Sequence, residues 1–367
     1  MKAVAAIVRE PAGPFLIETV DIAPPRADEV LIRMAAVGIC HSDVAFASGA
    51  MGAPLPMIFG HEGAGIIEAC GSAITGFCVG DKVLATFDSC GTCRCCTRHN
   101  PAYCRDFGLL NLSGARPDGS SAVTQDGAPI SAHFFSQSSF ASHAIARGSH
   151  LLKLSAEADL AVLAPFGCGI QTGAGAVMRS LAAKPGMSLI IVGAGAVGLS
   201  AVMAGRIVGC APIIVIEPSA NRRAQALALG ADHAFNPVGE DPVAAVKSVL
   251  PEGADMVIDT SGNGQALSRG IEMLGALGTL GMIGLPKTAD ATLALPIVSS
   301  MIDGLTVRGI MEGDSFPDDF LPELIAHYEA GRLPVDRIVT RYAFDRINDA
   351  IADMHAGKCV KAVLTFA

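Results

Sequence analysis

No charged residue occurs between positions 188 and 205, and the glycines within this stretch follow the spacing G-x-G-x-x-G. The stretch begins with the apolar run Ser188–Val192, which suits a buried parallel strand, and a helical run from Leu199 to Val208 follows the glycines. An uncharged run of this length would otherwise indicate a membrane-spanning helix. Strand, glycine turn and helix in this order instead predict the βαβ unit of a dinucleotide-binding domain.

The three glycines each have a physical role in such a unit. Gly193 permits the tight turn, Gly195 lets the backbone approach a pyrophosphate, and Gly198 allows the helix to pack closely on the strand. Glu217 ends the next predicted strand, nineteen residues after Gly198. Its carboxylate would accept hydrogen bonds from the adenosine ribose and repel a 2′-phosphate. These residues predict NAD as the cofactor, although Arg222 could pair with a phosphate.

The alternation of strands and helices continues beyond this unit. The apolar runs Met256–Thr260 and Leu280–Gly284 are typical of further buried strands. We therefore predict an α/β fold with a Rossmann-type doubly wound parallel sheet in residues 170–309. The flanking segments, 1–169 and 310–367, alternate short strands with turns and would form one discontinuous, β-rich catalytic domain.

Five of the eleven cysteines lie within fifteen residues. Four of them have the spacing C-x2-C-x2-C-x7-C, which suits a tetrahedral zinc in a lobe of about residues 88–106; they are Cys90, Cys93, Cys96 and Cys104. A closed shell of four sulfurs leaves no position for substrate, so this zinc would be structural. The spacing leaves Cys95 without a role. A redox-active Cys-x-x-Cys pair and clustering by chance are the alternatives.

Three other segments contribute one potential metal ligand each, Cys40, His61 and Cys168. Each is a weak signal alone, because a single buried cysteine is usually a small hydrophobe and a single histidine is usually a satisfied polar group. Together they would supply three protein ligands and leave a fourth position open. That is the pattern of a catalytic zinc.

The GHE-x-x-G motif at 60–65, the four-cysteine lobe and the later glycine motif occur in this order along the chain. In this respect the chain resembles the zinc-dependent medium-chain alcohol dehydrogenases, from its first strand to the closing GKCVKAVLTF. The stretches RPDGS, HFFSQSSFA and GCGIQTGAGAV most resemble the aryl-alcohol (benzyl-alcohol) branch of that family. The resemblance implies a GroES-like catalytic domain that includes the zinc lobe, and two zinc ions per subunit.

The resemblance also implies roles around the open zinc site. Cys40, His61 and Cys168 would bind the catalytic zinc. Glu62 would lie beside the metal as an occasional alternative ligand, and Asp43 would accept a hydrogen bond from His61. Such a contact fixes the imidazole tautomer and raises its basicity as a ligand.

For proton transfer, the resemblance implies that Ser42 takes the proton from the alcohol and passes it to the nicotinamide ribose. Ala45 stands where many relatives have the histidine that continues this relay, so water or a different base must complete it. The alternative role for Ser42 and Asp43 is capping of a short helix, predicted over residues 43–48.

Four further residues are expected to contact the cofactor by resemblance. His41 and Lys361 fall where the family places cationic contacts to the pyrophosphate, Thr172 falls near the nicotinamide, and Ile283 is a further expected contact. For the charged members the alternative is an ordinary solvated side chain, and for Thr172 it is a polar residue at a helix start.

Several apolar residues lie in segments that line the family's substrate pocket: Phe46, Met51, Phe87, Phe134 and Phe135. An aromatic wall favours a bulky primary alcohol, such as a benzyl, cinnamyl or terpenoid alcohol, over ethanol. A broad-range alcohol dehydrogenase is one alternative. A formaldehyde dehydrogenase acting on a glutathione adduct is another, with Arg116 as its nearest cationic group. A zinc-free quinone reductase and a non-catalytic, NAD-sensing zinc protein complete the alternatives, but neither needs an open zinc site.

Charge and composition indicate which partners and which compartment suit the protein. The formal net charge is -9, with Lys and Arg dispersed, so nucleic acid is an unfavourable partner. The amino terminus carries Arg9 and Glu10 before any signal-peptide core develops, and a thiol-rich metal lobe suits a reducing compartment, so we expect a cytoplasmic protein without membrane attachment. Leu305–Ile310 resembles the edge strand through which the family forms homodimers or homotetramers.

Overall fold

The computed structural model describes residues 1–366, which form two compact units. The first unit comprises Met1–Cys168, Phe316–Ile325 and the residues from Asp336 onwards. The second unit comprises Gly169–Ser315 and Ala326–Val335. The second unit therefore extends beyond the expected boundary at residue 309, because the turn at Glu312–Asp314 packs within it.

The second unit contains a six-stranded parallel sheet in the order β13-β12-β11-β14-β15-β16. In chain order its strands are β11 (Leu189–Val192), β12 (Ile213–Ile216), β13 (His233–Phe235), β14 (Ala254–Asp259), β15 (Leu274–Met282) and β16 (Thr306–Gly309). This 3-2-1-4-5-6 order is that of the doubly wound dinucleotide-binding fold, and it confirms the predicted fold class. The apolar residues of the central strands, such as Ile190 and Val257, are fully buried between the helical layers.

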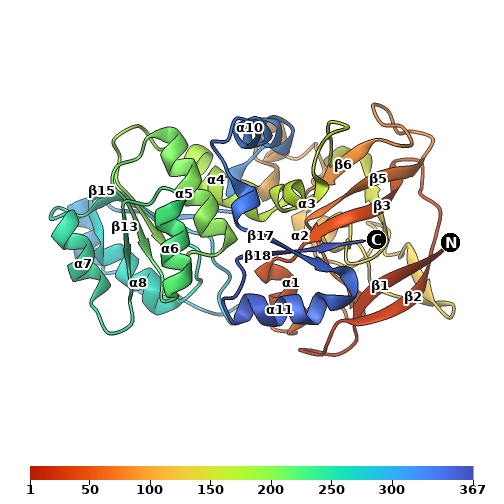
Figure 1. Cartoon of the computed structure of the whole chain (residues 1–367), viewed down its shortest axis with the longest axis horizontal. Coiled ribbons are helices and arrows are strands. Elements are labelled where there is room, and N and C mark those ends of the chain that lie inside the picture. The colour runs from red at the N-terminus through yellow and green to blue at the C-terminus, as the bar shows by residue number, and fades with distance from the viewer. Residues whose placement is uncertain (367) are drawn as a thin grey trace. The chain divides into compact units, whose positions relative to one another are not determined.

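Helices alternate with these strands along the chain (Figure 1). They are α4 (Gly169–Gly175), η6 (Ala176–Ser180), α5 (Ala196–Val208), α6 (Ala220–Ala228), α7 (Pro242–Val249), α8 (Gly264–Glu272), α9 (Ile297–Asp303) and η7 (Glu312–Asp314). The uncharged run from 188 to 205 thus forms β11, the glycine turn and most of α5. Helix α5 starts three residues earlier than predicted, with Gly195 as its N-cap, and ends at Val208; its C-cap is Gly209, whose φ of +89° lies in the left-handed region.

The first unit is built from two mainly antiparallel sheets. One has the strand order β4-β1-β2-β7-β8, and the other has β10-β6-β5-β3-β18-β17 with β9 also paired to β3. The strands are β1 (Lys2–Val8), β2 (Leu16–Ile22), β3 (Glu29–Gly38), β4 (Met57–Ile58), β5 (Gly63–Cys70), β6 (Lys82–Ala85), β7 (Val123–Gln125), β8 (Ala128–Pro129), β9 (His143–Arg147), β10 (Leu151–Lys153), β17 (Val339–Ala343) and β18 (Lys361–Thr365).

The C-terminal strand β18 closes the discontinuous unit. It pairs antiparallel with β3, with Val363 opposite Gly38, so a C-terminal strand completes the sheet that contains β3 (Figure 1). The helices of the first unit are short and lie mostly at strand ends. They are α1 (His41–Ala47), η1 (Cys96–Arg98), η2 (Pro101–Tyr103), α2 (Phe107–Asn111), η3 (Phe134–Ser136), η4 (Gly148–His150), α3 (Leu160–Leu163), η5 (Ala164–Gly167), η9 (Phe344–Arg346) and α11 (Ile347–His355). Helices α10 (Pro317–Glu329) and η8 (Val335–Arg337) contain residues of both units.

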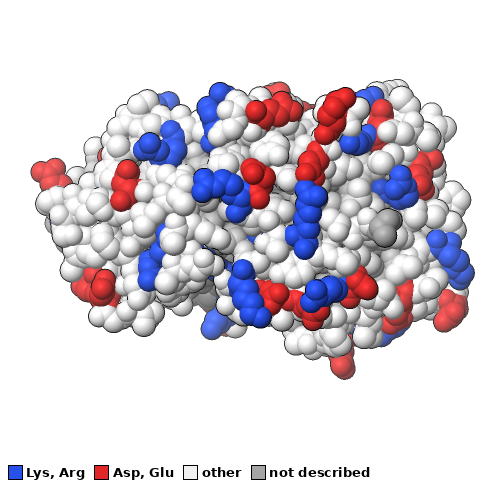
Figure 2. Space-filling view, in the orientation of Figure 1, with Lys and Arg blue, Asp and Glu red and all other residues white. Residues whose placement is uncertain are grey.

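No single helix within residues 1–366 is both long and apolar enough to cross a bilayer; one bent pair, Leu160–Gly167 with Gly169–Ser180, meets the criteria of length and composition only. On the molecular face drawn in Figure 2, basic and acidic side chains are interspersed rather than gathered by sign.

Candidate active site

Four potential metal ligands from distant parts of the sequence converge in the first unit. The ligand atoms of Cys40, His61, Glu62 and Cys168 all lie within 4.8 Å of one another. Cys40 follows β3, the His61–Glu62 pair joins β4 to β5, and Cys168 follows η5. The three ligands predicted for the open zinc site are therefore neighbours in space, although 128 positions separate Cys40 from Cys168 in the sequence.

Asp43 orients the imidazole of His61. The Asp43 Oδ1 atom lies 2.9 Å from His61 Nδ1 and also accepts a hydrogen bond from the backbone N–H of Gly60 at 2.9 Å. His61 is fully buried, and its Nε2 atom has no hydrogen-bond partner. Burial acts to lower the pKa of His61, but the charges of Asp43 and Cys40 raise it well above its ordinary value. With Nδ1 held by Asp43, Nε2 is the atom that a zinc ion would bind, and the metal would displace its proton.

The same carboxylate anchors Cys40. Its Oδ2 atom accepts a hydrogen bond from the backbone N–H of Cys40 at 2.9 Å, and Cys40 is the N-cap of α1. The predicted helix therefore begins at His41 rather than at Asp43, because the capping contact runs from residue 40 to residue 43. Ser42 is not the cap; its Oγ lies 3.7 Å from Cys40 Sγ.

The electrostatic environment favours a thiolate at Cys40. The neighbouring Cys168 thiol, together with His61 and Lys361, lowers the pKa of Cys40 well below its ordinary value, against the opposing effect of burial. A thiolate is the form that binds a metal. Two cysteines and one histidine whose Nε2 has no hydrogen-bond partner thus fit a zinc ion, with the carboxylate of Glu62 next to them.

Glu62 forms a fully buried ion pair with Lys361. The Lys361 Nζ atom lies 2.5 Å from Glu62 Oε2 and donates a second hydrogen bond to the Ile39 carbonyl at 2.9 Å. Burial raises the pKa of Glu62 to about 7, although the charge of Lys361 acts to lower it. Gly38 makes room for this pair, because a Cβ there would lie 1.9 Å from Glu62 Oε2. Lys361 is therefore not an ordinary solvated charge, whereas His41 is exposed.

Aromatic rings surround the imidazole of His61. Phe135 stacks on it with ring centroids 4.4 Å apart, and Phe134 approaches it edge-on at 5.4 Å. Phe46 contacts Phe134 at 5.3 Å, so three of the predicted pocket residues form one cluster. Phe107, which the sequence analysis missed, contacts Phe135 at 6.0 Å. Its only signal in the sequence is its place three residues after the last lobe cysteine.

The other two predicted pocket residues are Phe87 and Met51. Phe87 is buried and reaches the cluster through Phe107, at a centroid distance of 6.0 Å. Met51 is half-buried in the segment after α1. The sequence analysis also missed Gln137, a fully buried amide within HFFSQSSFA that contacts the backbone on both sides of Glu62.

The four-cysteine lobe forms a second potential metal site. The Sγ atoms of its four members lie within 4.8 Å of one another; they are Cys90, Cys93, Cys96 and Cys104. Backbone N–H groups point at these sulfurs, among them Cys93 N to Cys90 Sγ at 3.3 Å and Asp106 N to Cys104 Sγ at 3.4 Å. The backbone N–H of Arg105 is the main cause that lowers the pKa of Cys93 to about 6. Cys95 stands outside this set, as the N-cap of η1.

The glycine motif occupies the end of β11 in the second unit. Gly193 has a φ of +95°, and a Cβ at Gly198 would lie 2.0 Å from the Gly193 carbonyl, so the tight turn and the close packing both require glycine. A Cβ at Gly195 would meet no atom within 4 Å, so the space beside this residue is open. Glu217 is buried, and its carboxylate accepts a hydrogen bond from Ala194 N at 2.8 Å. This acid therefore also holds the glycine turn.

Three more of the expected cofactor residues lie in the second unit. Thr172 is buried in α4, and its Oγ1 lies 3.3 Å from Glu312 Oε2. Ile283 follows β15, with its N–H donating to the Asp259 carbonyl at 2.9 Å. Arg222 is half-buried in the first turn of α6 and donates its backbone N–H to the N-cap side chain of Ser219.

Comparison with known proteins decides the family. An alcohol dehydrogenase GroES-like domain matches residues 26–155, and a zinc-binding dehydrogenase domain matches residues 196–329. A geraniol dehydrogenase from Castellaniella defragrans is 43% identical over 368 residues, covering 100% of this chain and 98% of that protein. The chain belongs to the zinc-type medium-chain alcohol dehydrogenases. As a member of this family, it is an oxidoreductase that uses zinc and NAD(P).

Solved structures of other alcohol dehydrogenases agree with the fold over the full chain. A zinc-binding alcohol dehydrogenase domain protein from Burkholderia ambifaria has a TM-score of 0.97 and 44% identity, covering 100% of this chain and 99% of its own. The benzyl alcohol dehydrogenase of Acinetobacter calcoaceticus has a TM-score of 0.96 and 37% identity, with complete coverage of both chains. The predicted family and the predicted combination of GroES-like and Rossmann-type domains are thus confirmed.

Proposed function

We propose that this alcohol dehydrogenase reversibly oxidises aromatic or allylic primary alcohols to aldehydes, with NAD as the hydride acceptor. The observation that carries the proposal is the convergence of Cys40, Cys168 and the unpartnered Nε2 of His61, with the rings of Phe134 and Phe135 packed against the imidazole. Metal ligands with aromatic side chains beside them suit an alcohol with a bulky apolar substituent.

The protein's own residues hold the reacting groups and move the proton. When bound, zinc supplies a Lewis acid that makes an alcohol hydroxyl more acidic, and NAD supplies the hydride acceptor. Cys40, His61 and Cys168 would hold the metal, with Asp43 fixing the imidazole. Ser42, next to Cys40, would accept the alcohol proton. Ala45 cannot pass it on, so water would carry it from there.

Two observations support the substrate class. The ring cluster around His61 includes Phe46, Phe134 and Phe135. Two similar proteins are named a geraniol dehydrogenase and a benzyl alcohol dehydrogenase. Arg116 argues against the glutathione-adduct alternative: its guanidinium is 6% exposed and donates two hydrogen bonds, at 2.6 and 2.7 Å, to the carboxylate of Glu29. It is not available to a carboxylate of a glutathione adduct.

Glu217 supports NAD over NADP. Its carboxylate stands at the end of β12 and is fixed by the backbone N–H groups of Ala194 and Ser219 at 2.8 and 2.9 Å. Each carboxylate oxygen can still accept a further hydrogen bond from a ribose hydroxyl, while a 2′-phosphate would meet a fixed negative charge. Thr172, Ile283 and the glycine turn would contribute the other contacts from this unit.

We propose a second, structural zinc in the four-cysteine lobe. Four sulfurs with N–H donors around them suit a closed tetrahedral site, which has no position for substrate. The structure records no disulfide bond among the described residues. Thiol ligands of this kind persist in a reducing compartment, which favours the cytoplasm.

We also propose that two copies of the chain associate through the second unit. The apolar side chains of Ile297, Val298, Met301 and Ile302 on α9 are 71–78% exposed. They precede β16, the edge strand of the six-stranded sheet. An exposed apolar patch next to an unpaired strand edge is typical of an isologous interface. Met301→Glu should convert a dimer into a monomer, as measured by light scattering; an unchanged mass would contradict this interface.

One set of assays tests the proposed reaction. Purified protein should contain two zinc ions per chain and reduce NAD, but not NADP, with geraniol and benzyl alcohol at far higher kcat/KM than with ethanol. A glutathione–formaldehyde adduct should be inert. Two zinc ions without turnover of any alcohol would contradict the enzyme assignment at this site. Equal kcat/KM for ethanol and benzyl alcohol would favour the broad-range alternative.

A further inference from the structure

Gln137 contacts the backbone on both sides of Glu62. Its Nε2 atom donates a hydrogen bond to the carbonyl of His61 at 3.0 Å, and its Oε1 atom accepts one from the N–H of Gly63 at 3.1 Å. The Ser139 hydroxyl donates a further hydrogen bond to Oε1 at 2.6 Å. One amide therefore spans the three residues His61–Gly63 and is itself held in place by a neighbouring side chain.

The same amide is linked to the segment that carries Cys168. Gln137 Nε2 also lies 3.3 Å from the carbonyl of Thr86. The hydroxyl of Thr86 in turn donates to the carbonyl of Gly167 at 2.7 Å, immediately before Cys168. Two ligand-bearing segments, more than a hundred positions apart, are thus joined by a chain of two buried side chains.

These contacts leave little room for adjustment. Gln137 is 2% exposed and Thr86 is 3% exposed. A Cβ at Gly63 would lie 2.2 Å from Ser139 Oγ and 2.8 Å from Gln137 Oε1, so the backbone approaches the network as closely as glycine allows. At Gly167 a Cβ would lie 2.3 Å from the Ala85 carbonyl, next to Thr86.

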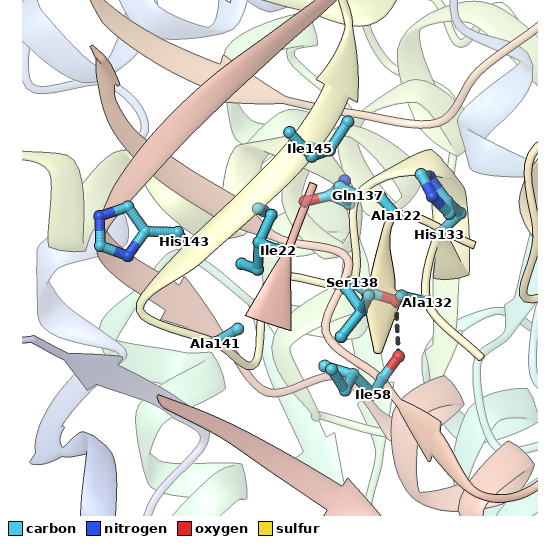
Figure 3. A pocket seen from close by; sticks show the side chains of 12 residues that line it. Ile22, Ile58, Ala122, Ala132, His133, Gln137, Ser138, Ala141, His143 and Ile145 are labelled. Atoms are coloured by element: carbon cyan, nitrogen blue, oxygen red, sulfur yellow. Dashed lines mark hydrogen bonds between the residues drawn. The ribbon is translucent and has the colours of Figure 1, made fainter. Parts of the chain in front are cut away.

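The loop that presents Gln137 has an unusual backbone. Several of its residues other than glycine have a positive φ: His133 (+91°), Phe135 (+50°), Ser136 (+58°) and Ser138 (+49°). Such conformations cost free energy and persist only where surrounding contacts over-determine them. Figure 3 shows Gln137 and Ser138 beside a small cavity with mainly apolar walls, where the Ser138 hydroxyl donates to the Ile58 carbonyl at 2.6 Å. The strained loop thus aims two side chains at the backbone before β5.

We infer that Gln137, acting with Thr86, is a positioning residue of the metal site, and that it holds the backbones of His61 and Cys168 at the separation that the metal requires. The inference rests on the proposed zinc site. Neither side chain has to touch the metal or the alcohol, because each acts through a backbone carbonyl or N–H of a ligand segment. Contacts of this kind outside the ligand shell typically change metal affinity or activity by about 10- to 100-fold.

The substitutions must remove hydrogen bonds without opening space. Gln137→Glu keeps the acceptor that faces Gly63 but replaces the donor to the carbonyls of His61 and Thr86. Gln137→Ala is unsuitable, because it would enlarge the cavity of Figure 3 and destabilise the fold by itself. Thr86→Val removes the hydroxyl contact to Gly167 at almost constant volume, and Thr86→Ser retains that contact and serves as the conservative control.

Asn111 provides a matched control at the other metal site. Its side chain accepts a hydrogen bond from Asp88 N at 2.8 Å and donates to the carbonyls of Asp88 and Phe107 at 2.9 and 3.0 Å. It therefore braces the two ends of the four-cysteine lobe with the same amide chemistry that Gln137 uses. Asn111→Asp replaces one donor by an acceptor, as Gln137→Glu does, in an equally buried position.

The readout is metal release from the holoenzyme to a chromogenic chelator, with Cys40→Ser and Cys93→Ser used to assign the two release phases. Gln137→Glu and Thr86→Val should speed release from the Cys40 site about 10- to 100-fold and leave the lobe phase unchanged. Thr86→Ser should resemble the wild type, and Asn111→Asp should speed only the lobe phase. Cobalt exchanged into the Cys40 site should show altered absorption bands in Gln137→Glu.

The outcomes separate the inference from the proposed function. If Gln137→Glu released the metal of the Cys40 site at the wild-type rate and its cobalt bands were unaltered, the inference would be overturned, but the proposed function would stand. Equal acceleration of both phases would also overturn it, since that result describes general destabilisation. If the Cys40→Ser variant contained as much metal as the wild type, the proposed site would be wrong, and the inference with it.

Discussion

Lys361 and Glu62 form an ion pair with a distance of 2.5 Å between Nζ and Oε2, and their side chains are 2% and 0% exposed. Lys361 belongs to the last strand of the chain, whereas Glu62 follows the imidazole that faces Cys40. The pair thus joins the C-terminal strand to the candidate metal site. A buried charge is tolerated only with a partner, so each residue depends on the other.

Lys361→Met should be strongly destabilising, because it leaves the Glu62 carboxylate buried without its cation. Breaking such a pair from one side typically costs roughly 3–5 kcal/mol. The double variant Lys361→Met/Glu62→Gln, which has no buried charge, should recover most of that loss. Urea unfolding of both variants measures the difference. If the single variant is as stable as the double one, the pair is not coupled as the structure implies.

Asp43→Asn should weaken metal binding almost as much as Asp43→Ala. The carboxylate accepts hydrogen bonds from three donors, the backbone N–H groups of Cys40 and Gly60 and the ring of His61. An amide turns one acceptor into a donor, so at least one of these groups would face another donor. We expect a loss of about 10- to 100-fold in zinc affinity, measured by competition with a chelator. Wild-type affinity in Asp43→Asn would show that the imidazole is oriented by other contacts.

Ser42→Ala should lower kcat by roughly 10²- to 10⁴-fold, the usual contribution of a positioned proton acceptor, without changing zinc content. Ser42 is not the N-cap of α1, so its removal should leave the helix intact. Steady-state kinetics with benzyl alcohol and metal analysis of the same sample make the comparison. Activity close to wild type would exclude Ser42 from the proton path.

Cys93→Ser should lose the second metal, whereas Cys95→Ser should retain it. The Cys93 sulfur lies 3.5 Å from Cys96 Sγ and accepts a hydrogen bond from the Arg105 N–H, while Cys95 is outside the set of four. Metal content of the two purified variants distinguishes them directly. If both variants bind the same amount of zinc, the four ligands have been chosen incorrectly.

Asp88 should contribute a pH-dependent part of the stability. Burial would raise its pKa, but His150 and Arg147 outweigh burial and lower it to about 2, from an unfolded value of 3.8. A lowered pKa means that the folded form binds this proton less readily, so the stabilisation is present above pH ~4 and is lost as pH falls towards 2.

Asp88→Asn should therefore reduce the free energy of unfolding by about 2 kcal/mol at pH 7 and by much less near pH 2. Urea unfolding at several pH values tests this. A difference between wild type and variant that does not change with pH would assign the effect to packing instead.

Much of this protein could be predicted from short sequence patterns. Gly193, Gly195 and Gly198 predict the nucleotide fold, because the turn and its neighbours all lie within one strand–turn–helix unit. The four-cysteine lobe is similar, since Cys90 and Cys93 meet within a single turn. Each of these patterns encodes contacts between residues that are close along the chain.

For the open metal site, the sequence offered three suitable ligand types, and the family resemblance supported their assignment to one ion. Cys40, His61 and Cys168 carry no mutual spacing that would identify them as ligands of one ion. Their meeting depends on the pairing of β3 with β5 and on the position of η5, which are long-range contacts. Sequence analysis also placed Lys361 near a pyrophosphate but did not detect its contact with Glu62.

The sequence by itself determined the nucleotide-binding βαβ unit, the thiolate lobe and the ligand types available for catalysis. Only the tertiary structure decided that Gln137 and Thr86 connect the ligand segments and that Glu62 is paired with Lys361. The physical reason is the distance along the chain between the residues that make each contact. Turns, caps and short ligand clusters are set by neighbours along the chain, whereas a buried hydrogen bond or ion pair forms only where sheet register brings distant residues within about 3 Å.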